Sequence, residues 1–101
     1  MFDPIRLMNM LKKATDFKQK IEGELKNMQT TGSAGGGIVK IQMNGVFEVE
    51  KVFIDPDIFN QKDNKFLEDL IKSSVNDSTK KVKDTLIDKI KDLVGNLNFL
   101  K

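Results

Sequence analysis

The sequence predicts an α+β fold in which a long helix, three antiparallel strands and a second long helix follow one another. Two patterns predict the helices: apolar residues recur every seven positions near the N-terminus, and a long helical stripe of apolar residues occupies the last third of the chain. Between them, apolar and polar residues alternate as in a half-buried strand. With 101 residues, the chain fits a single domain covering residues 1–101.

The first helix is expected over about residues 4–27. Asp3 is a suitable N-cap, and Pro4 suits the first helical position. The apolar residues form a coiled-coil-like seam, which consists of Leu7, Met10, Leu11, Ala14, Phe17, Ile21, Leu25 and Met28. This seam packs either on its own domain or against a second subunit, and both interpretations remain open.

Three strands are expected over about residues 28–32, 38–43 and 46–54. Val39, Ile41 and Met43 alternate with polar residues, which is the period of a half-buried strand. Asn44 and Gly45 follow at once and predict a two-residue type I′ hairpin turn, because such a turn needs positive φ at both positions.

The second helix is expected over about residues 64–94, with Asp63 or Asn64 as its cap. Its apolar residues recur at eleven-residue spacing, for example at Ile71 and Val82, which keeps the stripe nearly straight. At 1.5 Å per residue the helix is about 45 Å long, far longer than a three-stranded sheet can cover. Part of the stripe must therefore meet something else, most simply another copy of the chain.

The composition argues against an enzyme. The chain has no Cys and no His, so it offers neither a thiolate nucleophile, nor the usual ligands for zinc, nor the usual proton shuttle at neutral pH. We therefore expect no catalytic residues, no metal and no cofactor. No apolar run approaches the roughly 18 residues that a membrane span needs, and no signal peptide is recognisable, so a cytoplasmic location is expected.

The glycine-rich stretch at residues 32–37 resembles a phosphate-binding loop only superficially. Gly32 and Gly37 have the separation of a P-loop, but Ile38 and Val39 follow in place of Lys and Ser or Thr. The stretch also leads into a strand, so no helix N-terminus is available to bind a phosphate. We expect a hairpin connection with several residues at positive φ, and no small-molecule substrate.

Two further patterns on the second helix suggest chemistry but are better explained by chance or solvation. Ser78 and Lys81 form S-x-x-K without the companion motifs of serine acyl-enzymes. Asp84, Asp88 and Asp92 share one helix face, but neighbouring lysines make a solvated charged face the better interpretation.

The basic residues are the remaining candidates for a function. The net charge is only +2, and Arg6 is the only arginine among 17 basic residues. Because lysine acts as a point charge on phosphate, this bias favours contacts with a nucleic-acid backbone over reading of bases. Several lysines have acidic neighbours at helical spacing, such as Lys80 with Asp84 and Lys81 with Asp77.

A series of short motifs resembles the YbaB/EbfC family of bacterial nucleoid-associated proteins, in order and over nearly the full length. The motifs are T-G-S-A-G-G-G-I-V at residues 31–39, N-G at 44–45, I-D-P at 54–56, L-E-D-L-I at 67–71 and N-D at 76–77. The family often has alanines around its N-D pair, whereas this chain has Ser73, Ser74 and Ser78 there.

The resemblance implies an α–β–β–β–α protomer and a homodimer that is joined through its sheets, with long helices projecting like tweezers. It also implies binding of double-stranded DNA in the bacterial nucleoid, with effects on nucleoid organisation and gene expression. The candidates for DNA contacts, chosen by charge on the two helices, are Lys12, Lys13, Lys18, Lys20, Lys80, Lys81 and Lys83. The alternative function is a protein-interaction adaptor or scaffold dimer that grips a partner with its apolar helix stripes.

Overall fold

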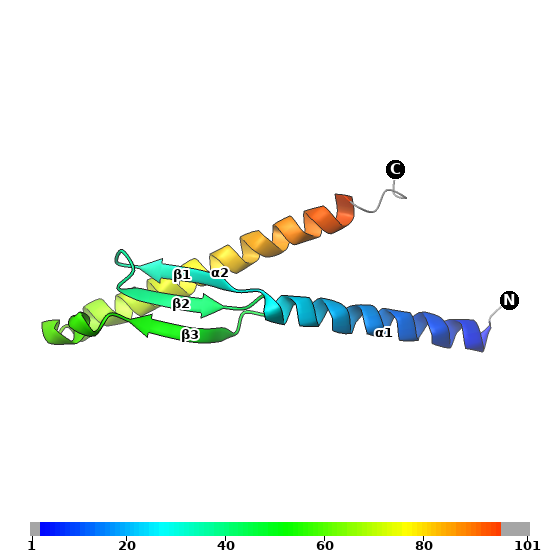
Figure 1. Cartoon of the computed structure of the whole chain (residues 1–101), viewed down its shortest axis with the longest axis horizontal. Helices are drawn as coiled ribbons and strands as arrows, with labels where there is room; N and C mark the ends of the chain where they lie inside the picture. Colours follow the sequence, from blue (N-terminus) through cyan, green and yellow to red (C-terminus); the bar gives the residue numbers. More distant parts are fainter. Residues whose placement is uncertain (1–2, 96–101) are drawn as a thin grey trace.

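The computed structural model describes residues 3–95 and has the predicted order of helix, three strands and helix. The elements are α1 (Pro4–Asn27), β1 (Thr30–Ala34), β2 (Val39–Met43), β3 (Val49–Ile54), a short 3-10 helix η1 (Pro56–Gln61) and α2 (Asn64–Gly95). The strands form one antiparallel sheet in the order β1-β2-β3. The molecule is elongated, 72 × 28 × 18 Å, because both helices extend beyond the sheet (Figure 1).

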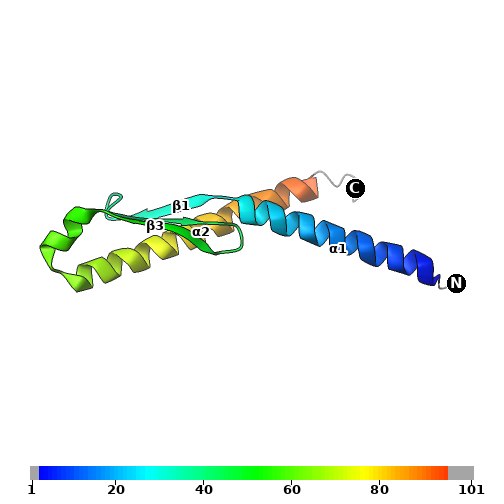
Figure 2. The same cartoon turned by 60° about the horizontal axis from the view of Figure 1, so that its bottom comes forward.

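Helix α2 crosses one face of the sheet and packs mainly on β1 and β2, which leaves the other face open (Figure 2). The core lies at this contact and is small. Its buried members are Val39, Ile41, Ile58 and Leu70, with Ala34, Ile38, Ile54, Leu67 and Val75 packed around them. The apolar residues of β2 face α2, as the alternation of the sequence predicts.

Two serines of α2 allow the helix to approach the sheet very closely. Ser74 and Ser78 are completely buried, and their hydroxyls donate to the carbonyls of Val39 (3.1 Å) and Ile41 (2.9 Å) on β2. Gly32 on β1 lies directly against Ser78. The small side chains of the stripe are therefore packing residues, and they keep their polar atoms satisfied inside the core.

The first strand is predicted over about residues 28–32, which places Gly32 at its end and at the start of the glycine-rich reversal. In the structure, β1 begins at Thr30 and ends at Ala34, so Gly32 lies inside the strand. The reversal itself uses Gly35, Gly36 and Gly37, all at positive φ, as the sequence predicts for such a turn. Gly32 serves a different purpose: close approach of a helix, which the local sequence does not reveal.

The predicted two-residue turn at Asn44-Gly45 is wrong. The connection covers residues 44–48, β3 starts at Val49 instead of residue 46, and the positive φ (64°) falls on Phe47. The reason is the buried Asn44 side chain, whose Oδ1 accepts hydrogen bonds from the backbone N–H groups of Val46 and Glu48, both at 3.0 Å. Asparagine commonly organises its own turn in this way.

Gly45 is needed because the loop touches the end of α1. Its N–H donates to the carbonyl of Leu25 at 2.7 Å, and a Cβ at this position would lie 2.6 Å from the same oxygen and 2.9 Å from Sδ of Met28. We expect Gly45→Ala to lower the free energy of unfolding by about 1–3 kcal/mol, because α1 must shift to admit the methyl group. Urea denaturation measures this, and an unchanged midpoint would contradict the close approach.

Candidate nucleic-acid interface

Helix α1 and the C-terminal part of α2 leave the same end of the sheet and diverge (Figure 1). Helix α1 has 24 residues, and none of them is buried. Its helical form is supported locally by Asp3, whose carboxylate accepts hydrogen bonds from the N–H groups of Ile5 and Arg6, and by Pro4 in the first turn. Two long helical surfaces are therefore exposed to solvent beyond this end of the sheet.

A groove of about 510 Å³ lies between the bases of the two projecting helices. Its lining is mainly apolar and comes from both helices: Ile21, Glu24, Leu25, Leu86, Lys89, Ile90 and Asp92. Further along α1 the apolar seam is uncovered, since Met10 is 61% and Phe17 55% exposed. The part of the seam beyond the groove therefore has no cover from within residues 3–95.

The candidate lysines on α1 are Lys12, Lys13, Lys18 and Lys20, and all four are exposed. Lys13 and Lys20 are seven residues apart, so they lie two turns apart on one face of the helix. Nζ of Lys18 lies 3.9 Å from Oε1 of Glu22. Because both side chains are exposed, this ion pair contributes little to stability.

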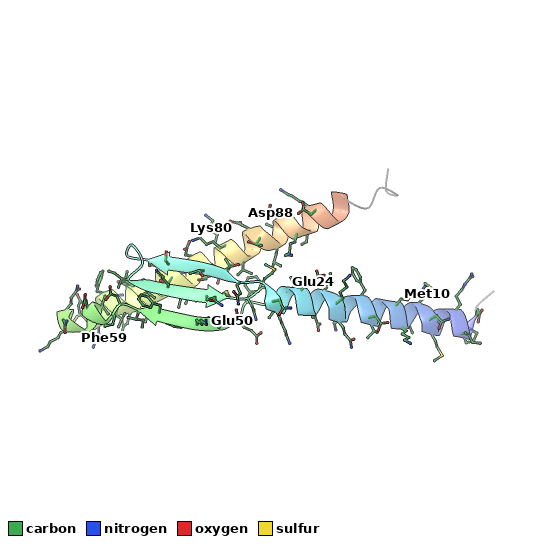
Figure 3. All side chains as sticks on the ribbon, viewed as in Figure 1. Met10, Glu24, Glu50, Phe59, Lys80 and Asp88 are labelled. Atoms are coloured by element: carbon green, nitrogen blue, oxygen red, sulfur yellow. The ribbon has the colours of Figure 1, made fainter. Side chains whose placement is uncertain are left out.

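The candidate lysines on α2 divide into two kinds. Lys80 and Lys83 are exposed and three residues apart on the face turned away from the sheet, where Figure 3 shows Lys80. Neither forms an ion pair with any residue in the range 3–95, so the Lys80–Asp84 pair suggested by their spacing is not made. Their charges are therefore available to an external ligand.

Lys81 instead points to the sheet. Its Nζ lies 3.0 Å from Oδ2 of Asp77 and donates to the carbonyl of Thr31 at 3.4 Å. The same Oδ2 of Asp77 accepts a hydrogen bond from the N–H of Ser33 at 2.9 Å. We call this arrangement the Asp77–Lys81 clamp, because the two side chains hold α2 to the outer edge of β1. The i, i+4 spacing predicts the ion pair, whereas the strand partners become visible only in the fold.

The hydrogen bond from the Ser33 N–H, together with Lys81, lowers the pKa of Asp77 from its usual value near 4. Because the folded pKa is depressed, the stabilising contribution of Asp77 is fully present above the unfolded pKa. It is lost as the pH falls through the folded pKa. The clamp therefore contributes at neutral pH and fails only in acid, below about pH 4.

We expect Asp77→Asn to lower the unfolding midpoint at pH 7 and to flatten its decline below pH 4, because the variant has no carboxylate to protonate at this position. Thermal melts between pH 2.5 and 7 measure both effects. Asp84→Asn is the matched control, since Asp84 is exposed and forms no ion pair within residues 3–95. Equal pH profiles for the two variants would contradict the role of the clamp.

The other sequence patterns do not assemble into sites. Ser78 is buried with its hydroxyl bonded to two carbonyls, and Lys81 belongs to the clamp, so S-x-x-K is not a catalytic pair. Within residues 3–95, no three carboxylates gather closely enough to hold a metal ion, and this includes Asp84, Asp88 and Asp92. Over the same range, no helix has both the length and the apolarity to span a membrane.

These features define an elongated α+β protein with two long helices that extend beyond the sheet and carry exposed lysines. Residues 2–97 match the model of the YbaB/EbfC DNA-binding family, and the chain belongs to this family. It is a family of DNA-binding proteins and not of enzymes, in agreement with the prediction from composition.

Relatives extend over most of the chain. A nucleoid-associated protein of Dictyoglomus thermophilum is 39% identical over 97 residues, which cover 96% of this chain and 93% of that protein. A nucleoid-associated protein of Bartonella bacilliformis is 34% identical over 94 residues, covering 90% and 87%. The crystal structure of an uncharacterized Helicobacter pylori protein has a TM-score of 0.73 and 22% identity, covering 93% and 99%, and shares the fold.

Proposed function

We propose that the chain binds duplex DNA as a homodimer, mainly through lysine contacts to backbone phosphates, in the bacterial nucleoid. The chain belongs to a DNA-binding family. The structural observation that carries this proposal is the pair Lys80 and Lys83. Both are exposed on a projecting helix and free of ion pairs within the described range 3–95. The names of the relatives support the nucleoid as the place of action. Effects on nucleoid organisation and gene expression would follow from binding many sites.

The chemistry of the basic residues favours binding that is nearly independent of DNA sequence. Lysine offers a single charged group to phosphate, whereas the paired hydrogen bonds that identify guanine are typical of arginine. Arg6 is the only arginine. Phosphate contacts release counterions, so the affinity should fall steeply as the salt concentration rises.

Exposed apolar surface supports the homodimer. Helix α1 carries the seam predicted from sequence but has no buried residue. A large exposed apolar patch of this kind marks a surface that another molecule covers. A second copy is the simplest cover, and it would also double the lysines that face one DNA molecule. The lysines Lys12, Lys13, Lys18 and Lys20 of α1 are proposed contacts on the same grounds, while Lys81 is better explained by the clamp.

Two measurements on the unmodified protein test the proposal together. Sedimentation equilibrium should give the mass of a dimer, and gel shifts at low salt should show binding to several unrelated duplexes with similar Kd. A monomer would contradict the homodimer, and absence of binding at low salt would contradict the DNA function.

A second candidate function, a protein-interaction adaptor, is favoured by the apolar groove between the helices and the near-neutral net charge. Affinity purification after nuclease treatment separates the two candidates. One stoichiometric protein partner, combined with no DNA binding by the purified chain, would favour the adaptor.

A further inference from the structure

The loop between β2 and β3 contains an Asn-Gly pair, which is a site of possible covalent change. Asn44 is the only asparagine of the chain that glycine follows. In such a pair the backbone nitrogen of the glycine can attack Cγ of the asparagine side chain, because glycine has no side chain to hinder the approach. This reaction is one reason why asparagine is a thermolabile residue. The conformation of the loop decides whether the attack takes place.

Hydrogen bonds hold both reacting groups in the folded loop. The attacking nitrogen, that of Gly45, donates to the carbonyl of Leu25 in the last turn of α1 at 2.7 Å (Figure 1). The side-chain amide of Asn44 is buried, and its Oδ1 accepts from the N–H groups of Val46 and Glu48. Its Nδ2 donates to Oε1 of Glu48 at 3.0 Å.

The reaction cannot proceed without breaking two of these bonds. It removes the proton through which Gly45 binds the carbonyl of Leu25, and it expels the Nδ2 atom through which Asn44 binds Glu48. Asn44 is only 4% exposed, so the base that takes the proton and the water that completes the reaction also need an open loop. Local opening of this kind has its own free energy, which sets the rate of the reaction in the folded protein.

We propose that Asn44 is a site of spontaneous deamidation, which the folded loop suppresses and which opening of the loop permits. In the open loop, hydroxide or a buffer base takes the proton of the Gly45 N–H, and the nitrogen forms a bond to Cγ of Asn44. The Cγ–Nδ2 bond breaks, and the expelled nitrogen takes up a proton and leaves as ammonia. Water then opens the resulting cyclic succinimide at either carbonyl, which gives aspartate or isoaspartate at position 44.

Neither product fits the closed loop. An aspartate at position 44 has a carboxylate oxygen in place of Nδ2, where the distance to Oε1 of Glu48 is 3.0 Å. Two carboxylates at this distance repel each other in a buried position. Isoaspartate instead adds a carbon atom to the backbone of the loop. Both changes hold the loop open and separate Gly45 from Leu25. Because α1 has no buried residue, the loss of this bond loosens its attachment to the sheet.

Deamidation rates in the folded and the unfolded chain test the protection. Wild-type protein is incubated at mildly alkaline pH with and without denaturing urea, and peptide maps quantify aspartate and isoaspartate at position 44. The folded protein should react at least about tenfold more slowly, because only its open form reacts. Equal rates, or no product at position 44 in urea, would overturn the proposal.

Removing the partner of Nδ2 tests whether the loop controls the rate. Glu48→Ala should speed deamidation of the folded protein by about tenfold, the effect of losing one hydrogen bond to a charged group, and should leave the rate in urea unchanged. Glu50→Ala is the matched control, since Glu50 is exposed and accepts from Gln42 outside the loop. Equal rates for the two folded variants would overturn the proposal.

A substitution that imitates the product tests its effect on α1. In Asn44→Asp the Gly45 amide should exchange its hydrogen with solvent at least about tenfold faster than in the wild type, while the Ser33 amide, bonded to Asp77, should be unaffected. Adding Glu48→Gln should restore slow exchange, because the glutamine can donate to the new carboxylate. Unchanged exchange in Asn44→Asp, or no restoration in the double variant, would overturn the proposed effect on α1. No measurement uses DNA, so the outcome is independent of the proposed function.

Discussion

Replacing Gly32 by alanine is expected to lower the free energy of unfolding by about 3 kcal/mol or more, the upper end of overpacking effects. A Cβ at this position would overlap the backbone nitrogen and the hydroxyl oxygen of Ser78 and would lie 2.7 Å from its Cα. Because two of these three atoms belong to the backbone of α2, the helix itself must move away from the sheet. The Ser74 and Ser78 hydrogen bonds to β2 would then break as well. Urea denaturation measures the loss.

Two comparisons make the Gly32 prediction specific. Adding Ser78→Gly to Gly32→Ala should not restore stability, because removing the hydroxyl leaves the backbone overlap in place. Gly23→Ala, in the exposed interior of α1 with open space around it, should instead stabilise the protein by up to about 1 kcal/mol. A Gly32→Ala variant with the unfolding midpoint of the wild type would contradict the close packing of α2 on β1.

Reversing the charges of Lys80 and Lys83 is expected to weaken DNA binding by more than about tenfold at physiological salt. In a homodimer the double variant Lys80→Glu/Lys83→Glu removes four cations from the proposed interface. Each lost phosphate contact reduces the slope of log Kd against log salt concentration by about 0.9, so the slope should fall by roughly 3 to 4. Fluorescence anisotropy with a labelled duplex measures both quantities.

The matched control carries the same change of charge at the other end of the sheet. Lys62 and Lys65 lie around the start of α2, far from its projecting part, and Lys65 is paired with Asp69. Lys62→Glu/Lys65→Glu should retain most of the affinity. Equal losses for the two double variants would mean that net charge, and not the position of Lys80 and Lys83 on α2, decides binding. Sedimentation of both variants checks that the dimer persists.

The order of elements could be predicted because each long element carries its own periodic signal. The seam of α1, the alternation at Val39 to Met43 and the stripe of α2 are all local patterns. The errors arose where a distant part of the fold decides a local conformation. Gly32 lies inside β1 at the point where α2 approaches too closely for a side chain. The Asn44 loop is longer than a two-residue turn because the buried side chain of Asn44 accepts hydrogen bonds from the N–H groups of Val46 and Glu48, in addition to the backbone bonds of the loop.

The exposure of the candidate lysines was predictable to a similar degree. Charge and helical spacing are enough to select lysines on the two helices, because exposure follows from the apolar stripe on the opposite face. They do not distinguish Lys80 and Lys83 from Lys81, since all three lie in one charged segment. The difference depends on Ser33 and Thr31, which reach Asp77 and Lys81 only when the sheet forms under α2.

The most direct test of the central claim is a salt titration of binding to three duplexes of unrelated sequence. Binding of a dimer through lysine–phosphate contacts predicts similar Kd values for the three duplexes and a linear fall of log affinity with log salt concentration. Four or more contacts give a slope of about −4 or steeper. Affinity that is independent of salt, or confined to one of the three sequences, would contradict it.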